Sequence, residues 1–197
     1  KNKKLLGIRL RSDSININKR IISNNFEIIS NSKIPIDLLV SVKDFDYVTL
    51  LAYSFSEINF VINHLMNVNI KDQSLNKEQL SVFKKLSLYQ NIYMKISSII
   101  NLLDLNMIDI NKYSYSKIID QILGIFGEDR IIYGSNWPVS NMVADFNVHF
   151  DLLFNIFTKL GSNIKNNFFF NNAINVYSKN SQIQLLSAND EVSLKNT

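Results

Sequence analysis

Five short runs of aliphatic and β-branched residues alternate with longer stretches of helical periodicity, and this alternation restricts the fold more than any other feature of the chain. The runs, which we predict to be buried strands, are Leu5–Leu10, Ile34–Val40, Asn59–Asn63, Ile92–Ile96 and Arg130–Gly134. The stretches between them, which we predict to be helices, are Ile17–Asn31, Lys43–Phe55, Leu75–Leu88 and Tyr115–Phe126. Repeated strand-helix alternation is typical of parallel sheets with helical crossovers, so the predicted fold class is α/β.

The segments after the fifth run favour part of a barrel over an open, doubly wound sheet. A long helix is expected from about Ala144 to Leu160 and a short one from about Ala173 to Tyr177, with no sixth strand. The chain has neither the glycine-rich dinucleotide fingerprint nor a phosphate-binding Gly-Lys-Ser or Gly-Lys-Thr loop. The spacing of the strands is close to that of a (β/α)₈ TIM barrel. Since the sequence begins with Lys1 rather than Met, we interpret it as an incomplete barrel.

Composition excludes several classes of protein. With 46% hydrophobic and 19% charged residues, the chain can bury enough apolar surface to fold. It has no cysteine, which excludes disulfide scaffolds, thiolate zinc sites and cysteine nucleophiles, and which favours a cytoplasmic location. Its apolar runs are too short to cross a membrane, and no signal peptide is evident. The net charge of +4 is concentrated in the first 20 residues without a recurring basic-aromatic pattern, so we do not expect nucleic-acid binding.

Polar residues recur where the predicted strands end, which is the edge that carries the active site of a barrel. The candidates at these ends are Arg9, His64, Lys95, Ser97, Ser135, Asn136 and Trp137. His64 could bind a divalent metal or act as a general acid or base, or it could only hydrogen-bond a loop carbonyl. Lys95, if it faces the barrel interior, needs a carboxylate or a substrate as its partner; if it faces outward, it has no such role.

The other candidates have simpler alternatives. Arg9 could bind a substrate carboxylate or phosphate, or pair with an acidic residue on a neighbouring strand. The stretch from Gly134 to Pro138 is expected to turn closely past a ligand, with Trp137, the only tryptophan, as a wall of the pocket. His149 falls on the face of an amphipathic helix, so we interpret it as structural.

Several of these segments, taken in chain order, together carry a resemblance to a known family. The segments are Gly7-Ile8-Arg9, Ile36-Asp37-Leu38-Leu39-Val40, Phe60-Val61-Ile62-Asn63-His64-Leu65, Asn91-Ile92-Tyr93-Met94-Lys95-Ile96-Ser97, Phe126 to Arg130, Gly134-Ser135-Asn136-Trp137-Pro138-Val139, and Asn172-Ala173 to Tyr177. Together they resemble the C-terminal two-thirds of the amidohydrolase-2 family, in the branch that includes sugar lactonases. The resemblance implies that residues 1–180 form strands four to eight of a single TIM-barrel domain, followed by a tail over 181–197.

The resemblance also implies roles for individual residues. His64 matches the family's histidine on the sixth strand, and Asn136 matches the acidic position on the eighth strand, where an aspartate acts as general base. Arg9 and Lys95 match recurring basic positions that hold the substrate. The chain departs from the family pattern at Asn136, because a neutral amide has no useful basicity. It also has Val42-Lys43 in place of a Pro-His pair.

The metal prediction follows from the same departures. The usual Gly-Lys-Pro loop is replaced by Met66-Asn67-Val68, and the family's His-x-His pair on the first strand is absent from the sequence. His64 is then the one plausible ligand in this chain, whereas a catalytic zinc ordinarily has three. A divalent metal such as zinc would need further ligands from an N-terminal part.

The expected function is therefore a hydrolase that opens a sugar lactone, or a related cyclic ester or amide, with an activated water. His64 and Asn136 are the expected catalytic residues, and Arg9, Lys95 and Trp137 are expected to bind a small-molecule substrate. Two alternatives stay open: a non-oxidative decarboxylase of the same family, and a catalytically silent barrel that binds small molecules. We also expect the 197 residues alone to be inactive and to aggregate, because a barrel without three strands has unpaired edges.

Overall fold

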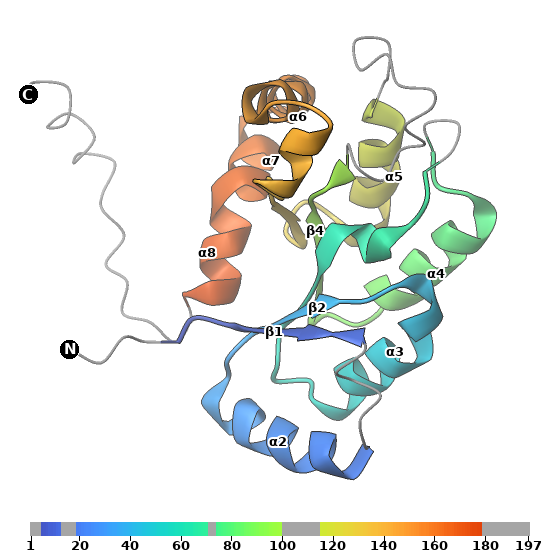
Figure 1. Ribbon diagram of the computed structural model, residues 1–197, viewed down its shortest axis with the longest axis vertical. Coiled ribbons are helices and arrows are strands. Elements are labelled where there is room, and N and C mark those ends of the chain that lie inside the picture. The colour runs from blue at the N-terminus through green and yellow to red at the C-terminus, as the bar shows by residue number, and fades with distance from the viewer. Residues whose placement is uncertain (1–4, 13–18, 71–73, 100–114, 179–197) are drawn as a thin grey trace, which may run out of the picture.

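A parallel five-stranded sheet forms the centre of the molecule (Figure 1). The computed structural model describes residues 5–12, 19–70, 74–99 and 115–178. The strands are β1 (Ile8–Arg11), β2 (Ile36–Leu39), β3 (Phe60–Ile62), β4 (Ile92–Ile96) and β5 (Ile131–Tyr133). They pair in chain order, and every pair is parallel. The predicted α/β class and the five predicted strands are confirmed, with ends that differ by at most three residues.

Helices connect the strands and continue after the last one. They are α2 (Lys19–Ser32), α3 (Phe45–Ser54), α4 (Lys77–Ser87), α5 (Ser116–Phe126), α6 (Phe146–Leu160), α7 (Ser162–Asn166) and α8 (Asn172–Tyr177), with a π-helical turn over Asn167–Asn171. The start of the helix predicted from Ile17 and the tail predicted over 181–197 lie outside the described residues, and the domain boundaries stay a prediction. No described helix has the length and apolar character to cross a bilayer.

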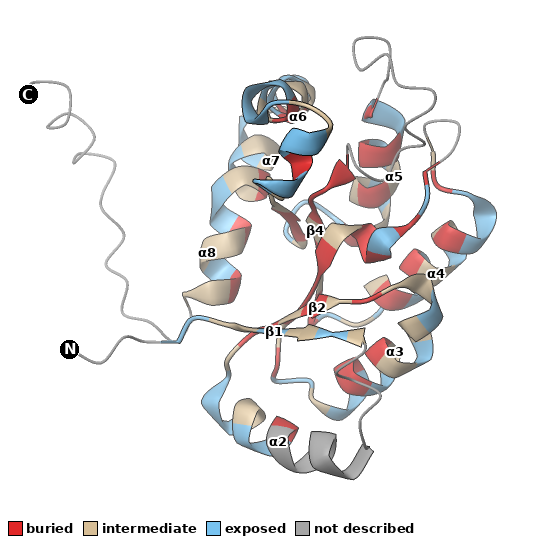
Figure 2. Ribbon diagram, viewed as in Figure 1, coloured by how far each residue is buried: buried red, intermediate tan, exposed pale blue. Residues whose placement is uncertain are grey.

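Alternation along the strands separates the two faces of the sheet. In Figure 2, β2 and β4 alternate between buried and intermediate residues. Ile36, Leu38 and Met94 belong to the buried set, which packs with residues of α3, α4 and α5 into the main hydrophobic core. Because these helices cover one face and the strand order never reverses, the sheet has the topology of part of a barrel and has no switch point of a doubly wound sheet.

The opposite face of the sheet is partly covered by α8. Val61 of β3 and Ile132 of β5 form a small second core with Val176 of α8. The amide of Asn172, at the start of α8, donates to the carbonyls of Glu128 and Ile131 at 2.7 and 2.8 Å. Figure 1 shows α8 on the other side of the sheet from α3 and α4. We call this the inner face, because it would line the interior of a closed barrel.

Local sequence signals account for several helix ends. Asn76 and Gln79 form a reciprocal capping box at the start of α4. Gly127 ends α5 with a φ of 75°, a left-handed conformation that glycine adopts without steric cost. The structure differs from the sequence prediction after α6, where helical residues run almost continuously from Ser162 into α8. No strand follows β5 in the described part of the chain, as predicted.

Candidate active site

Three neighbouring strands place polar side chains at one edge of the sheet. His64 follows β3, Ser97 and Ser98 follow β4, and Asn136 lies shortly after β5. These are the carboxyl ends of the strands, where parallel barrels carry their active sites. Two separate hydrogen bonds pair His64 with Ser97 and Asn136 with Ser98, so the two predicted catalytic residues contact adjacent serines.

A left-handed turn presents His64. Residues His64, Leu65, Met66 and Asn67 all have a positive φ, between 49° and 56°. A non-glycine residue in this conformation costs about 1–2 kcal/mol, so the surrounding structure must compensate. Leu65 and Met66 are fully buried, and the amide of Asn67 donates to the carbonyl of Val40 at 3.1 Å. Strain of this kind, held by packing at the end of a barrel strand, is characteristic of functional sites.

The imidazole of His64 is held by the first serine. Its Nδ1 lies 2.7 Å from Oγ of Ser97, which is buried. Burial and the positive charges of Arg9 and Lys95 lower the pKa of His64, and they outweigh the opposing effects of hydrogen bonding to Ser97 and of the Asp37 carboxylate. The ring is therefore held neutral near pH 7, the form that accepts a proton or binds a metal.

Asn136 is held by the second serine. Its amide nitrogen donates to Oγ of Ser98 at 2.9 Å, and its backbone is left-handed with a φ of 54°, a conformation that asparagine tolerates better than most residues. Gly134, two residues earlier, provides space: a Cβ there would lie 2.7 Å from the Cβ of Ser97. The close approach expected for this glycine is thus to β4. Among the candidate residues of this turn, Trp137 alone is mostly exposed, with an exposed fraction of 63%.

Lys95 has the carboxylate partner that an inward-facing lysine needs. Its Nζ donates to Oδ2 of Asp37 at 2.5 Å and to the hydroxyl of Tyr177 at 2.9 Å. The Tyr177 hydroxyl also donates to Asp37. Burial and the Asp37 carboxylate raise the pKa of Tyr177, so its phenol stays protonated. This cluster joins β2, β4 and α8 on the inner face.

The sequence analysis did not select Asp37 or Tyr177 as site residues. A signal for Asp37 was present, since it is the one charged residue within the apolar run Ile34–Val40. For Tyr177 there was none, because nothing local indicates that α8 returns to the inner face. Arg9 lies opposite Asp37 in the strand register, is exposed, and acts on His64 through its charge.

His149 lies away from these residues. It is 1% exposed on α6, and its ring stacks on Tyr133 with 6.5 Å between the centroids. Neither ring nitrogen has a hydrogen-bond partner among the described residues, and burial lowers the pKa of the imidazole. Its position within an aromatic cluster agrees with the structural interpretation of the sequence.

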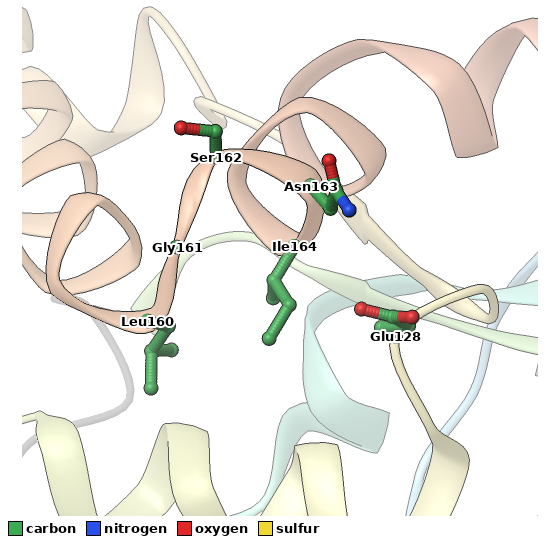
Figure 3. A pocket seen from close by; sticks show the side chains of 6 residues that line it. All are labelled: Glu128, Leu160, Gly161, Ser162, Asn163 and Ile164. Carbon is green, nitrogen blue, oxygen red and sulfur yellow. The ribbon is translucent and has the colours of Figure 1, made fainter.

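Two hollows lie near opposite ends of the sheet. One, of about 380 Å³, is at the carboxyl ends of β1 and β2, next to the left-handed turn; it is lined by Arg11, Ser12, Leu39, Val40, Ser41 and Asn67. Its size suits a small molecule. The other, of about 490 Å³, is lined by Glu128 and residues 160–164 (Figure 3). Glu128 precedes β5, so this hollow is at the amino end of that strand, far from the chemistry of a barrel.

The described residues do not form a metal centre by themselves. Within these ranges no group of three histidine, cysteine or acidic side chains is arranged to hold an ion. His64 is the one predicted ligand, and its Nδ1 is occupied by Ser97, which leaves Nε2 as the free donor atom. The described residues thus do not supply the three protein ligands that a catalytic zinc ordinarily has.

The family profile described as amidohydrolase matches residues 6–179 of this chain. The chain belongs to the amidohydrolase family. This confirms the resemblance found in the sequence, over nearly the same span. No curated protein sequence matches the chain. The polar residues of this amidohydrolase lie at the carboxyl ends of its strands, which agrees with membership of a family of barrels.

Solved structures support the same fold. The chain is similar to an amidohydrolase from Burkholderia multivorans that was crystallised with bound Zn, with a TM-score of 0.77, 15% identity, and coverage of 90% of this chain and 66% of that one. A second crystal form of the Burkholderia protein, with bound Hepes, has a TM-score of 0.74 and 16% identity, and the match covers 89% of this chain and 65% of that one. A putative 2-pyrone-4,6-dicarboxylic acid hydrolase from Pseudomonas putida has a TM-score of 0.68 and 16% identity, and the match covers 88% of this chain and 63% of that one.

These identities establish the fold alone. The chain spans about two-thirds of the length of the Burkholderia protein, and the sheet is accordingly an incomplete (β/α)₈ barrel, as predicted.

Proposed function

We propose that this chain carries the catalytic edge of a hydrolase that opens a cyclic ester by attack of water. The observation that carries the proposal is the pair of hydrogen bonds that brings a neutral histidine and an asparagine to adjacent serines at the carboxyl edge of the barrel. A neutral imidazole can accept a proton from water, and an amide can orient that water. The 380 Å³ hollow beside the turn of His64 offers space for a small substrate.

The reaction balances with these groups alone. Nε2 of His64 takes a proton from water while the water oxygen forms a bond to the carbonyl carbon of the ring. The ring C–O bond then breaks, and the proton passes from His64 to the departing oxygen, which gives a hydroxy acid. Arg9, exposed on the inner face, would stabilise the developing oxyanion or bind a carboxylate of the substrate.

Lys95 and Trp137 take more modest roles in this proposal. The ammonium of Lys95 is engaged by Asp37 and Tyr177, so it would act mainly through its charge, which helps to keep His64 neutral. Trp137 would offer an exposed flat surface at the mouth of the site. If a metal takes part, its remaining ligands would come from outside the described residues.

Two classes of cyclic ester suit a cationic site of this kind. Sugar lactones have a ring ester and hydroxyls, and the substrate named for the Pseudomonas relative, 2-pyrone-4,6-dicarboxylic acid, has a ring ester and two carboxylates. Arg9 favours the anionic class, because a guanidinium binds carboxylates through paired hydrogen bonds. Both classes release acid on ring opening.

The test is a pH-indicator assay on the longest natural chain that contains this sequence, with panels of aldonolactones and pyrone carboxylates. We expect turnover that falls about 10²- to 10⁴-fold in His64→Gln, the range for loss of a general acid-base group. Thermal melting of the variant checks that it folds. No turnover on either panel would contradict the proposal, and release of CO₂ in place of acid would indicate a decarboxylase.

The silent barrel stays a second candidate, because Asn136 occupies the position that the family resemblance assigns to a carboxylate. An amide cannot act as a base. Asn136→Asp distinguishes the two functions: activity that appears only in this variant would show that the natural chain binds without catalysis, whereas activity that needs Asn136 supports the hydrolase.

A further inference from the structure

We propose that Ser97 and Ser98 are positioning residues that together orient the two catalytic side chains, with Ser97 fixing the hydrogen of the neutral His64 ring on Nδ1. The inference rests on the proposed function for its catalytic meaning, but its main readout is independent of catalysis. Both serines are buried, at 1% and 7% exposure, so they act through His64 and Asn136.

The environment of His64 supports this tautomer. Among the described residues, Ser97 is the only hydrogen-bond partner of the imidazole, and its Oγ lies 2.7 Å from Nδ1. A serine hydroxyl can donate or accept. In the proposed mechanism Nε2 accepts the proton from water, so the neutral ring must carry its one hydrogen on Nδ1, the nitrogen that faces Ser97. The Ser97 hydroxyl then accepts from Nδ1, and the lone pair of Nε2 stays available.

Gly134 makes the arrangement possible. A Cβ at this position would lie 2.7 Å from the Cβ of Ser97 and 3.3 Å from side-chain carbons of Lys95, much closer than side chains pack. The backbone N–H of Gly134 donates to the carbonyl of Ile96, so β5 is fixed against the end of β4 at this point. Ser97 can therefore lie under His64 only because residue 134 has no side chain.

Ser98 acts in the same way on Asn136. The amide nitrogen of Asn136 is committed to Oγ of Ser98, and its backbone carbonyl accepts from the N–H of Ser140 at 3.1 Å. In this arrangement the amide nitrogen is the end turned toward the serine. The amide oxygen, an acceptor only, is left to receive a hydrogen bond from water.

Nitrogen NMR of the histidine rings tests the tautomer directly. In long-range ¹H–¹⁵N spectra of the full natural chain at neutral pH, the His64 ring is assigned by its loss in His64→Gln. We expect the wild-type ring to carry its hydrogen on Nδ1. In Ser97→Ala we expect the hydrogen to move to Nε2, or both forms to be populated. The matched change one residue on, Ser98→Ala, should leave the His64 spectrum unchanged.

Kinetics provides the second measurement. If the protein hydrolyses a lactone, Ser97→Ala should lower kcat about 10- to 100-fold with little change in KM, as expected for loss of a partner that orients a reacting imidazole. A wild-type ring with its hydrogen on Nε2 overturns the proposal even if neither variant folds. The proposal is also overturned if Ser98→Ala changes the His64 ring spectrum as strongly as Ser97→Ala does. Failure of every lactone assay contradicts the proposed function and leaves the NMR result to decide the tautomer.

Discussion

The neutral state of His64 is the chemical property on which the proposed function depends, and it arises from the groups around the imidazole. Burial and two nearby cations disfavour the imidazolium, so the pKa is lowered from the ordinary value of about 6.5. The sequence placed His64 and both cations at strand ends. It could not reveal the left-handed turn, because that conformation depends on burial of Leu65 and Met66 and on no local signal.

The first prediction concerns the pH dependence of this residue. Because the pKa of His64 is lowered, the free base persists to more acidic pH than in a solvent-exposed histidine. We expect the acid limb of kcat/KM to lie below pH 6.5, measured on any lactone that the protein turns over. An acid limb at or above the ordinary value would contradict the electrostatic interpretation.

A second prediction concerns His149, which is buried without a hydrogen-bond partner among the described residues. The unfolded chain binds a proton at this residue below about pH 6.5, whereas the folded chain does so only at lower pH. The free energy of unfolding should therefore decrease as the pH falls through this window. His149→Phe keeps the ring stack on Tyr133 and removes the titration, so its denaturant midpoint should fall less between pH 7.5 and 5.5. Equal pH dependence in both proteins would refute this origin.

At the scale of elements, the periodicity of the sequence predicted every described strand and most helices. β4 was placed at Ile92–Ile96 with both ends correct, since its apolar residues alternate regularly between Asn91 and Ser97. The helical connection from Ser162 to Asn171 was not predicted, because Gly161 before it and the asparagines within it indicate a loop. It forms nonetheless, since Phe168 is buried there and stacks on Phe157 of α6.

A pair of glycine substitutions tests the contact between β5 and β4. In Gly134→Ala the new methyl group would meet the Cβ of Ser97, which we expect to cost about 1–3 kcal/mol of unfolding free energy through overpacking. Gly124→Ala is the matched control: it lies within α5, where a Cβ meets nothing within 4 Å. It should stabilise the protein by about 0.4–1 kcal/mol. Denaturant unfolding measures both, and the same sign for the two changes would contradict the packing.

A pair of asparagine substitutions tests the attachment of α8. Asn172→Ala leaves the carbonyls of Glu128 and Ile131 without their donor, and the buried cost of such a loss is about 1–3 kcal/mol. The neighbouring Asn171→Ala removes an exposed hydrogen bond to Asn167 and should change stability by less than about 0.5 kcal/mol. Thermal unfolding of the two variants side by side gives the comparison, and equal losses would show that α8 is not anchored through Asn172.

At the scale of the whole molecule, β1 and β5 each pair on one side within the described residues. Unpaired strand edges promote association between chains. We expect a chain limited to residues 1–197 to form mixed oligomers or aggregates at micromolar concentration in sedimentation velocity, and a chain that also contains the strands of a complete barrel to sediment as one species. A monomeric 197-residue chain that melts cooperatively would contradict this expectation.

The part of the site that the sequence missed is also a property of the whole molecule. Arg9, His64 and Asn136 were identified because each lies on or shortly after a strand that local patterns locate. The cluster of Asp37, Lys95 and Tyr177 depends on where a helix at the other end of the chain docks, and no local pattern encodes that. Local patterns therefore identified Lys95 but not Asp37 and Tyr177, the two partners that tertiary structure brings to it.

The hydrogen bond between Tyr177 and Asp37 joins positions 140 residues apart. During synthesis β2 and β4 leave the ribosome well before α8. The carboxylate of Asp37 and the ammonium of Lys95 are therefore made before the Tyr177 hydroxyl that binds them both. Contacts of such long range form late and slow folding. The cluster of Asp37, Lys95 and Tyr177 on the inner face can thus be completed only after translation has passed the last described helix.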